Sequence, residues 1–276
     1  YFIIDEGFLL ERPDLLVAGR TLVGAAAAAA AVAAGIVPLA IGTQTVGSTI
    51  RPAAYCGIVG YKPSFDRLDT TGLLYFSRSA DHVGLFAQDV AGLHLAASAL
   101  IDNWTEERLP PEKPVLAVAD GDYLQQAEAS TLEKFEEQIQ QLIHAGYVIK
   151  RVDLGVDIAA LKTLHFDMIA AEVAQEHANW FAEYESRYRP KTAEIIRQGQ
   201  GVSPERLEEG RNNRLMLREH LHNLLRDQGA DVWISPATTG EAPKGLESTG
   251  DSSMNLLWTH AGLPAVTVPV GNGPNG

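Results

Sequence analysis

The sequence predicts an α/β layered domain with a mainly parallel or mixed sheet. Short apolar runs of strand length recur along the chain, and longer stretches with helical periodicity separate them. Such alternation is typical of domains whose helices pack against the faces of a sheet. The length of 276 residues suits one large domain or two small ones, and the 46% apolar content is that of a folded globular chain.

The first predicted elements are a helix and a strand. Residues 25–34 are almost all alanine, the strongest helix former, and Gly35 stands where a left-handed C-cap is expected. Residues 37–41 form a short apolar run that is typical of a buried strand. The uncharged stretch 21–50 is long enough for a bilayer span, but Gly35 and Pro38 interrupt it and polar residues follow at once. We therefore expect a buried helix and strand there.

Helices and strands alternate through the rest of the chain. The pattern predicts helices at 90–101, 130–145, 158–188, 203–227 and 254–261, and strands at 115–119, 148–154, 232–234 and 265–268. Asp89 is a favourable N-cap for the first of these helices. Ser130 and Glu133 form a capping box for the second, which is expected to end at Gly146, and Pro204 suits the first turn of the fourth.

The net charge and the cysteine content limit which molecules the protein could bind and in which cellular compartment it could work. A net charge of −13 argues against a nucleic-acid groove or an anionic membrane surface, since both need clustered lysine and arginine. Cys56 is the single cysteine, so no intrachain disulfide can form, and the composition suits a reducing cytoplasm. The first residues are acidic and lack the basic start of a secretory signal. We expect a cytoplasmic protein.

A glycine-containing turn follows the first predicted strand and carries Ser48. A strand that leads into such a turn places backbone N–H groups at the edge of a sheet where α/β proteins often bind ligands. The N–H groups of residues 45–48 could stabilise an oxyanion if a base activated the Ser48 hydroxyl, so acyl transfer is one hypothesis. The other hypothesis is that Ser48 and the neighbouring threonines only satisfy backbone groups in a tight turn.

A nucleotide-binding interpretation of the same turn is weaker. The spacing of Gly42, Gly47 and Ser48 imitates a phosphate-binding loop with serine in place of lysine. The missing lysine charge, and Pro52 at a position where a helix should continue, both argue against that function.

Residues 42–64, GTQTVGSTIRPAAYCGIVGYKPS, resemble the signature segment of the amidase signature family. Members carry Gly-Thr-(Asp or Gln)-Thr-Gly-Gly-Ser, then Arg and Pro-Ala-Ala-Phe-Cys-Gly, then Gly-x-Lys-Pro. Downstream, SRSADHVGLFAQDVAGL at 77–93 resembles the family's S-x-S-x-D-x-x-G passage, and TGDSSMNLLWTHAGLPAVTVPVG at 249–271 resembles its carboxyl-terminal segment. The resemblance implies an α/β/α sandwich around a mixed, twisted sheet, and hydrolysis of a carboxylic amide.

The resemblance also implies a set of site residues. In this family a serine attacks the amide carbonyl, a second serine in a cis peptide relays its proton, and a lysine is the base. The nucleophile then corresponds to Ser48, and the oxyanion hole to Thr45, Val46 and Gly47, with Val46 replacing a glycine of the family. The relay serine is expected 24 residues before the nucleophile, where this chain has Gly24, and the catalytic lysine is not found in the chain.

The incomplete triad leaves three explanations open. The chain is a piece of a longer enzyme, a degenerate amidase that binds without hydrolysis or serves as a subunit, or an active variant whose base comes from elsewhere, such as His82. We expect residues 1–276 to form a single amidase-like domain, incomplete at both ends, with a mostly helical insertion at about 156–228. No metal or organic cofactor is implied, the expected partner is a small-molecule amide, and the family often forms homodimers.

Other polar residues have simpler interpretations. The family's lysine at the position of Lys62 is not its catalytic one, so a structural role is expected. Cys56 is expected to be a small buried residue. Four residues share one predicted helix without a metal-binding motif, so a solvated helix face is expected for His165, Glu172, Glu176 and His177.

Overall fold

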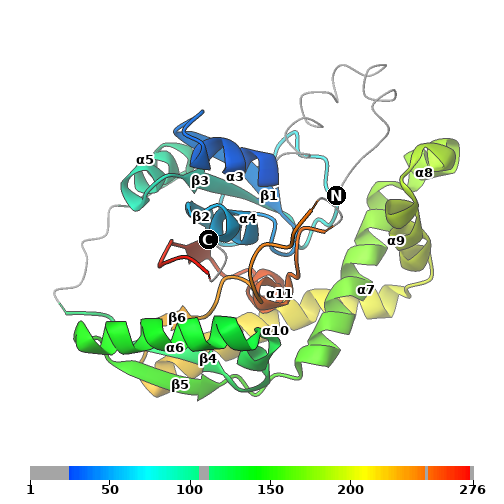
Figure 1. The fold of residues 1–276 in the computed structure, drawn as a ribbon. Helices are drawn as coiled ribbons and strands as arrows, with labels where there is room; N and C mark the ends of the chain where they lie inside the picture. Colours follow the sequence, from blue (N-terminus) through cyan, green and yellow to red (C-terminus); the bar gives the residue numbers. More distant parts are fainter. Residues whose placement is uncertain (1–24, 106–111, 246–247, 274–276) are drawn as a thin grey trace.

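The computed structural model describes residues 25–105, 112–245 and 248–273. The described strands are β1 (Leu39–Gln44), β2 (Val59–Lys62), β3 (His82–Ala87), β4 (Leu116–Asp120), β5 (Ile149–Asp153), β6 (Val232–Ile234) and β7 (Ala265–Thr267). One sheet has the order β1-β3-β2-β7 with antiparallel neighbours, and the other has the order β5-β4-β6 with parallel neighbours. The fold is an α/β/α sandwich with mixed strands, so the predicted fold class is confirmed (Figure 1).

Helices make up much of the rest of the described chain. They are α3 (Ala25–Ala33), α4 (Ile50–Tyr55), α5 (Val90–Leu100), α6 (Ala129–His144), α7 (Ile158–Glu176), α8 (Ala178–Tyr184), α9 (Pro190–Gln200), α10 (Pro204–Gln228) and α11 (Ser253–His260), with short 3-10 helices η1 (Gly121–Gln126) and η2 (Glu185–Arg187). Within the described residues, no helix has both the length and the apolar character that a bilayer span requires. The uncharged stretch 21–50, whose length would suit a bilayer span, contains helix α3 and strand β1 instead.

Helices pack on both faces of the first sheet. Phe86 forms a core cluster with residues of α3 and α4 on one face, and Leu85 forms another with residues of α5 on the opposite face. The approach of α4 is very close, because a Cβ on Gly60 would lie 2.5 Å from the Cβ of Ala53. A Cβ on Gly84 would lie 2.6 Å from the Thr49 hydroxyl. Glycine at these two strand positions therefore allows α4 to rest on the sheet.

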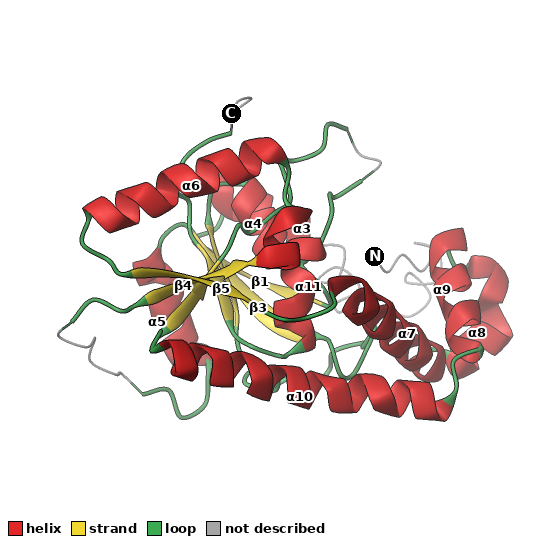
Figure 2. Ribbon diagram, turned by 90° about the horizontal axis from the view of Figure 1, so that it is seen from below, coloured by secondary structure: helices red, strands yellow, loops and turns green. Residues whose placement is uncertain are grey.

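The second sheet lies between α6 and α10 (Figure 2). Val118 of β4 packs with Phe135 and Ile139 of α6 on one face. Ala119, the next residue of the strand, joins a cluster with Leu217 and other residues of α10, α7 and α11. Successive side chains of a strand point to opposite faces, so this short apolar strand is buried on both sides, as its sequence predicts.

Several helix boundaries match the sequence, and some do not. Gly35 has a φ of 68°, and the Asp89 carboxylate accepts a hydrogen bond from the N–H of Gly92, so both predicted caps are confirmed. The predicted capping box is wrong, because α6 begins one residue earlier and Ser130 lies inside its first turn. Glu128 occupies the N-cap position, and its N–H is bonded to the carbonyl of Thr239, so a tertiary contact sets the start of this helix.

The stretch 156–228 contains α7, α8, α9 and α10, of which α9 was not predicted. Helices α7 and α9 cross closely at Gly199, which touches the backbone of Ala170. The assignment of this stretch as an insertion in a single domain stays a prediction. Cys56 is half-buried, which is less burial than the sequence predicts.

Three basic side chains hold the C-terminal end of α11. Arg214 and Arg218 of α10 donate hydrogen bonds to the carbonyls of His260 and Ala261. Lys62 of β2 donates to the carbonyls of Pro63 and Leu263. A helix C-terminus carries unpaired carbonyls and partial negative charge, so cations are favoured there. These contacts fasten α11 to the first sheet and to α10.

We predict that the substitution Gly60→Ala destabilises the protein by about 1–3 kcal/mol, because the new methyl group overlaps Ala53 and forces α4 away from the sheet. The measurement is urea unfolding followed by circular dichroism. A matched control is Gly201→Ala at the end of α9, where a Cβ would meet only the Gln198 carbonyl, at 3.4 Å. Equal unfolding midpoints for the two variants would show that α4 does not pack this closely.

The pH dependence of stability tests the burial of Lys62. Burial, and then the charges of Arg214 and Arg218, lower the pKa of Lys62 from 10.5 to about 7. Between these two values the unfolded chain keeps a proton that the folded chain has released, so the free energy of unfolding rises with pH. From about pH 7 to about pH 9 the wild type should gain roughly 2 kcal/mol relative to Lys62→Met. The measurement is urea unfolding at several pH values. If the free energy of unfolding changed with pH equally in the wild type and in Lys62→Met, this account of Lys62 would be contradicted.

Candidate functional site

Ser48 lies in the turn that joins β1 to α4. Its side chain is half-buried, and no described residue hydrogen-bonds to its hydroxyl. Within the described part of the chain, the N–H groups of Val46, Gly47 and Ser48 have no hydrogen-bond acceptor either. Three consecutive N–H groups that find no acceptor in the described residues, next to a hydroxyl of the same kind, are unusual, because most backbone donors are paired in folded proteins.

Helix α4 begins directly after this turn, at Ile50, and Pro52 lies in its first turn. Proline is tolerated there because the first N–H groups of a helix have no intrahelical acceptor. The expectation that Pro52 prevents a helix at this point is therefore wrong. The lysine of a phosphate-binding loop is still missing from the motif, since Ser48 and Thr49 directly follow Gly47.

The side chain of Gln44 organises the turn. Gln44 is 1% exposed, and its Oε1 accepts hydrogen bonds from the N–H groups of Thr49 and Ile50, at 2.9 and 3.1 Å. Its Nε2 donates to the Thr259 hydroxyl at 2.9 Å, and that hydroxyl donates to the carbonyl of Val46 at 3.4 Å. One carboxamide thus links the end of β1, the start of α4 and helix α11.

Val46 and Gly47, both assigned to the oxyanion hole by resemblance, face the interior of the protein. The Val46 side chain packs against two core clusters, one that contains Leu257 and one that contains Met168. Gly47 lies against the carboxamide of Asn255, whose Oδ1 would overlap any Cβ at position 47. The valine that replaces the family's glycine is therefore accommodated by the core, whereas Gly47 has no room for a side chain.

Asp81 holds the first residue of the turn. Its Oδ1 accepts a hydrogen bond from the Thr45 hydroxyl at 2.6 Å, and its Oδ2 accepts from the N–H groups of Phe76 and Ser77 at 2.6 and 3.1 Å. Burial raises the pKa of Asp81 to about 6, against the lowering effect of these hydrogen bonds. The sequence singled out Asp81 only as part of the S-x-S-x-D passage, and gave no partner for it.

Glu172 of α7 holds the same S-x-S-x-D passage from the other side. Its carboxylate accepts hydrogen bonds from the Ser77 and Ser79 hydroxyls, the Ser79 N–H and the Arg211 guanidinium. Burial acts to raise the pKa of Glu172, but these donors outweigh it and the pKa is lowered. Glu172 is 2% exposed, so the predicted solvated helix face is wrong.

The histidines of the same helix are buried as well. His165 and His260 have their Nδ1 atoms 2.9 Å apart, and His177 Nδ1 lies 2.8 Å from the Tyr188 hydroxyl. Burial lowers the pKa values of all three. Among the described residues, no group of three or more His, Cys, Asp or Glu side chains is arranged to hold a metal ion.

His82, the residue suggested as an alternative base, lies directly opposite Gln44 in the β1–β3 pair. It is buried, its Nδ1 donates to the carbonyl of Ala80 at 2.6 Å, and its Nε2 has no hydrogen-bond partner among the described residues. Burial, and then the charge of Lys62, lower its pKa well below the ordinary value. The relay position, Gly24, lies outside the described residues.

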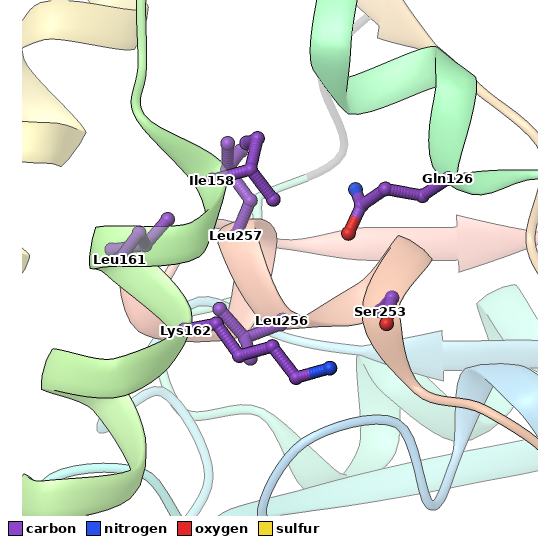
Figure 3. Close-up of a pocket in the computed structure, with 7 residues that line it drawn as sticks. All are labelled: Gln126, Ile158, Leu161, Lys162, Ser253, Leu256 and Leu257. Atoms are coloured by element: carbon purple, nitrogen blue, oxygen red, sulfur yellow. The ribbon is translucent and has the colours of Figure 1, made fainter.

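The segment before α11 folds against α4 beside the turn. The guanidinium of Arg51 is buried and donates to the carbonyl of Gly250 at 2.8 Å and to the Thr249 hydroxyl at 3.3 Å. A small apolar pocket of about 10 Å³ lies nearby between η1, α7 and α11 (Figure 3). Its lining residues are Gln126, Ile158, Leu161, Lys162, Ser253, Leu256 and Leu257. None of them belongs to the Ser48 turn, and the volume holds no more than a water molecule.

Comparison with known proteins finds relatives that match most of this chain. The chain is 26% identical over 278 residues to Amidase 1 of Arabidopsis thaliana, an alignment that covers 88% of this chain and 65% of the relative. It is 25% identical to a subunit of the glutamyl-tRNA(Gln) amidotransferase of Methanothermobacter thermautotrophicus, with 88% and 59% covered. A solved structure described as an amidase superposes with a TM-score of 0.81 at 25% identity and covers 90% of this chain and 58% of that one.

The chain therefore spans about 60% of the length of these relatives. A model of the family named Amidase matches residues 25–276, which is nearly the whole chain and includes the Ser48 turn, the S-x-S-x-D passage and helix α11. The resemblance found in the sequence is thereby confirmed, and this chain belongs to the amidase family.

Proposed function

We propose that this chain forms part of an amidase that hydrolyses a carboxylic amide through Ser48, with release of ammonia or an amine. The observation that carries the proposal is the Ser48 turn itself. Its hydroxyl and the three N–H groups of residues 46–48 lack partners among the described residues, while the surrounding backbone is fixed by Gln44, Thr259 and Asp81. A site that must bind a developing oxyanion needs donors that are held in place and still free.

The proposed reaction has two steps. The Ser48 Oγ attacks the amide carbonyl carbon, its proton passes to a base, and the carbonyl oxygen becomes an oxyanion that accepts hydrogen bonds from the free N–H groups. The C–N bond then breaks as the nitrogen takes up a proton, which leaves an acyl-enzyme. Water attacks the acyl carbon, and the acid leaves as the Ser48 hydroxyl regains its proton.

The assignment of Thr45, Val46 and Gly47 to the oxyanion hole is part of this proposal. Loss of one such donor typically costs about 3 kcal/mol of transition-state stabilisation, so a turn held at fixed points is valuable to the reaction. We also propose a small-molecule amide as substrate, a cytoplasmic location and homodimer formation.

A second function, binding without hydrolysis, is favoured by the residue at position 24. This position carries glycine where the family resemblance implies a relay hydroxyl. A serine without a base is a poor nucleophile. One relative is named as a component of an amidotransferase, so a role as a non-catalytic subunit is the corresponding alternative.

Labelling with a fluorophosphonate probe separates the two functions. We predict a single adduct, located by peptide mass spectrometry at Ser48 and absent from the Ser48→Ala variant. The matched control is Ser130→Ala in the exposed first turn of α6, which should label at the wild-type rate. An activated serine should react roughly a hundredfold faster than one without a base.

The opposite result is equally informative. If the folded wild type gives no adduct, or reacts at a site other than Ser48, the hydrolytic proposal is wrong for this chain and the binding function takes its place. Circular dichroism of the same sample checks that the protein is folded.

A further inference from the structure

The hydrogen bond between Thr45 and Asp81 joins two segments that the proposed reaction does not otherwise connect. Thr45 begins the Ser48 turn, and Asp81 ends the S-x-S-x-D passage, which precedes β3. Their side-chain oxygens are 2.6 Å apart. The other oxygen of the Asp81 carboxylate is occupied by the N–H groups of Phe76 and Ser77.

Burial of the Asp81 carboxylate costs free energy of folding. Asp81 is 6% exposed, no cation pairs with it among the described hydrogen bonds and ion pairs, and the nearby negative charge of Glu172 acts against its ionisation. A buried charge of this kind seldom adds net stability. Its three donors instead fix one arrangement of the backbone, which is the property that a preorganised site requires.

The contact also completes the support of the Ser48 turn. Gln44 binds the N–H groups of Thr49 and Ile50 at the far end of the turn, and Thr259 binds the carbonyl of Val46 in its middle. The near end is held through the Thr45 side chain. Threonine is stiff about χ1, so anchoring its hydroxyl restricts the rotation of the peptide that carries its N–H.

We propose that Asp81 is a positioning residue of the Ser48 turn, acting through the hydroxyl of Thr45. This inference rests on the proposed function, because it concerns the same N–H groups and the same nucleophile. Asp81 contacts no reacting atom in this scheme. Its effect on Ser48 is transmitted by one hydrogen bond, and that bond can be removed without disturbing the contacts of Asp81 with Phe76 and Ser77.

The test uses two substitutions. Thr45→Val removes the hydroxyl and keeps the shape of the side chain, whereas Thr45→Ser keeps the hydroxyl and removes the methyl group. Thr71→Val is the matched control, since Thr71 makes the same kind of hydrogen bond to Asp69 at 2.7 Å on the exposed surface. The reporter is amide hydrogen exchange at Thr49 and Arg51, whose N–H groups are bonded to Gln44 and to the carbonyl of Gly47. These amides do not contact Asp81 or the Thr45 hydroxyl.

We expect Thr45→Val to speed exchange at these amides by about tenfold, while Thr45→Ser and Thr71→Val stay within about threefold of wild type. The fluorophosphonate labelling rate of Ser48 should follow the same order. Unchanged exchange in Thr45→Val would overturn the proposal, and so would a wild-type labelling rate in a variant whose exchange has increased.

The two proposals can fail separately. If the wild type is not labelled at all, the hydrolytic function fails, while faster exchange in Thr45→Val still supports the positioning role. If Ser48 is labelled in the wild type but the Thr45→Val variant matches it in both readouts, the hydrolytic function stands and the role of Asp81 is overturned. Asp81→Ala serves as a second variant, and exchange as slow as in wild type would contradict the proposal as well.

Discussion

A single buried carboxamide, that of Gln44, determines where Ser48 lies relative to the rest of the protein. A buried amide group is unfavourable unless both its oxygen and its nitrogen find partners. Gln44 finds them in two segments: Thr49 and Ile50 follow it closely in the chain, whereas Thr259 of α11 is 215 residues away. The oxygen takes the two N–H groups that the start of α4 would otherwise leave unpaired. The nitrogen binds α11. Satisfying this one side chain therefore requires β1, α4 and α11 to meet at one place, and the Ser48 turn lies between them.

Helix α11 extends this constraint to both sheets, between which it lies (Figure 1). Residues of α11 pack with Ala119 of β4 and Trp233 of β6, whereas Thr259 and Asn255 of the same helix contact the turn. The basic side chains Lys62, Arg214 and Arg218 at its C-terminal end tie it to β2 and α10. The position of the turn thus depends on the docking of both halves of the structure. Gly60 and Gly84 support the same arrangement. Because they carry no side chain, α4 can approach the strands closely enough for Gln44 to reach it.

The sequence predicts what depends on local chemistry and misses what depends on distant partners. Helix α3 ends just before Gly35, and α10 begins after the cap Ser203, because glycine and serine act within a few residues of their own position. Strands β2 and β3 were not predicted, since the glycines that admit α4 also remove their alternation. The motif identified the Ser48 turn, but Glu172 was assigned to solvent because its partner Ser79 lies 93 residues away. The bonds from Gln44 to Thr259 and from Asp81 to Thr45 could not be derived from spacing, because no local pattern marks either partner.

A double-mutant cycle on Gln44 and Thr259 tests this account most directly. The variants are Gln44→Leu, Thr259→Val and the combination, and the quantity measured is the free energy of unfolding in urea. If the carboxamide and the hydroxyl form the link described here, removing either partner removes the interaction, and the double variant loses less than the sum of the two single losses. The account predicts a coupling energy of about 1 kcal/mol or more. Additive losses, within about 0.5 kcal/mol, would contradict it and would show that the turn is held without this hydrogen bond.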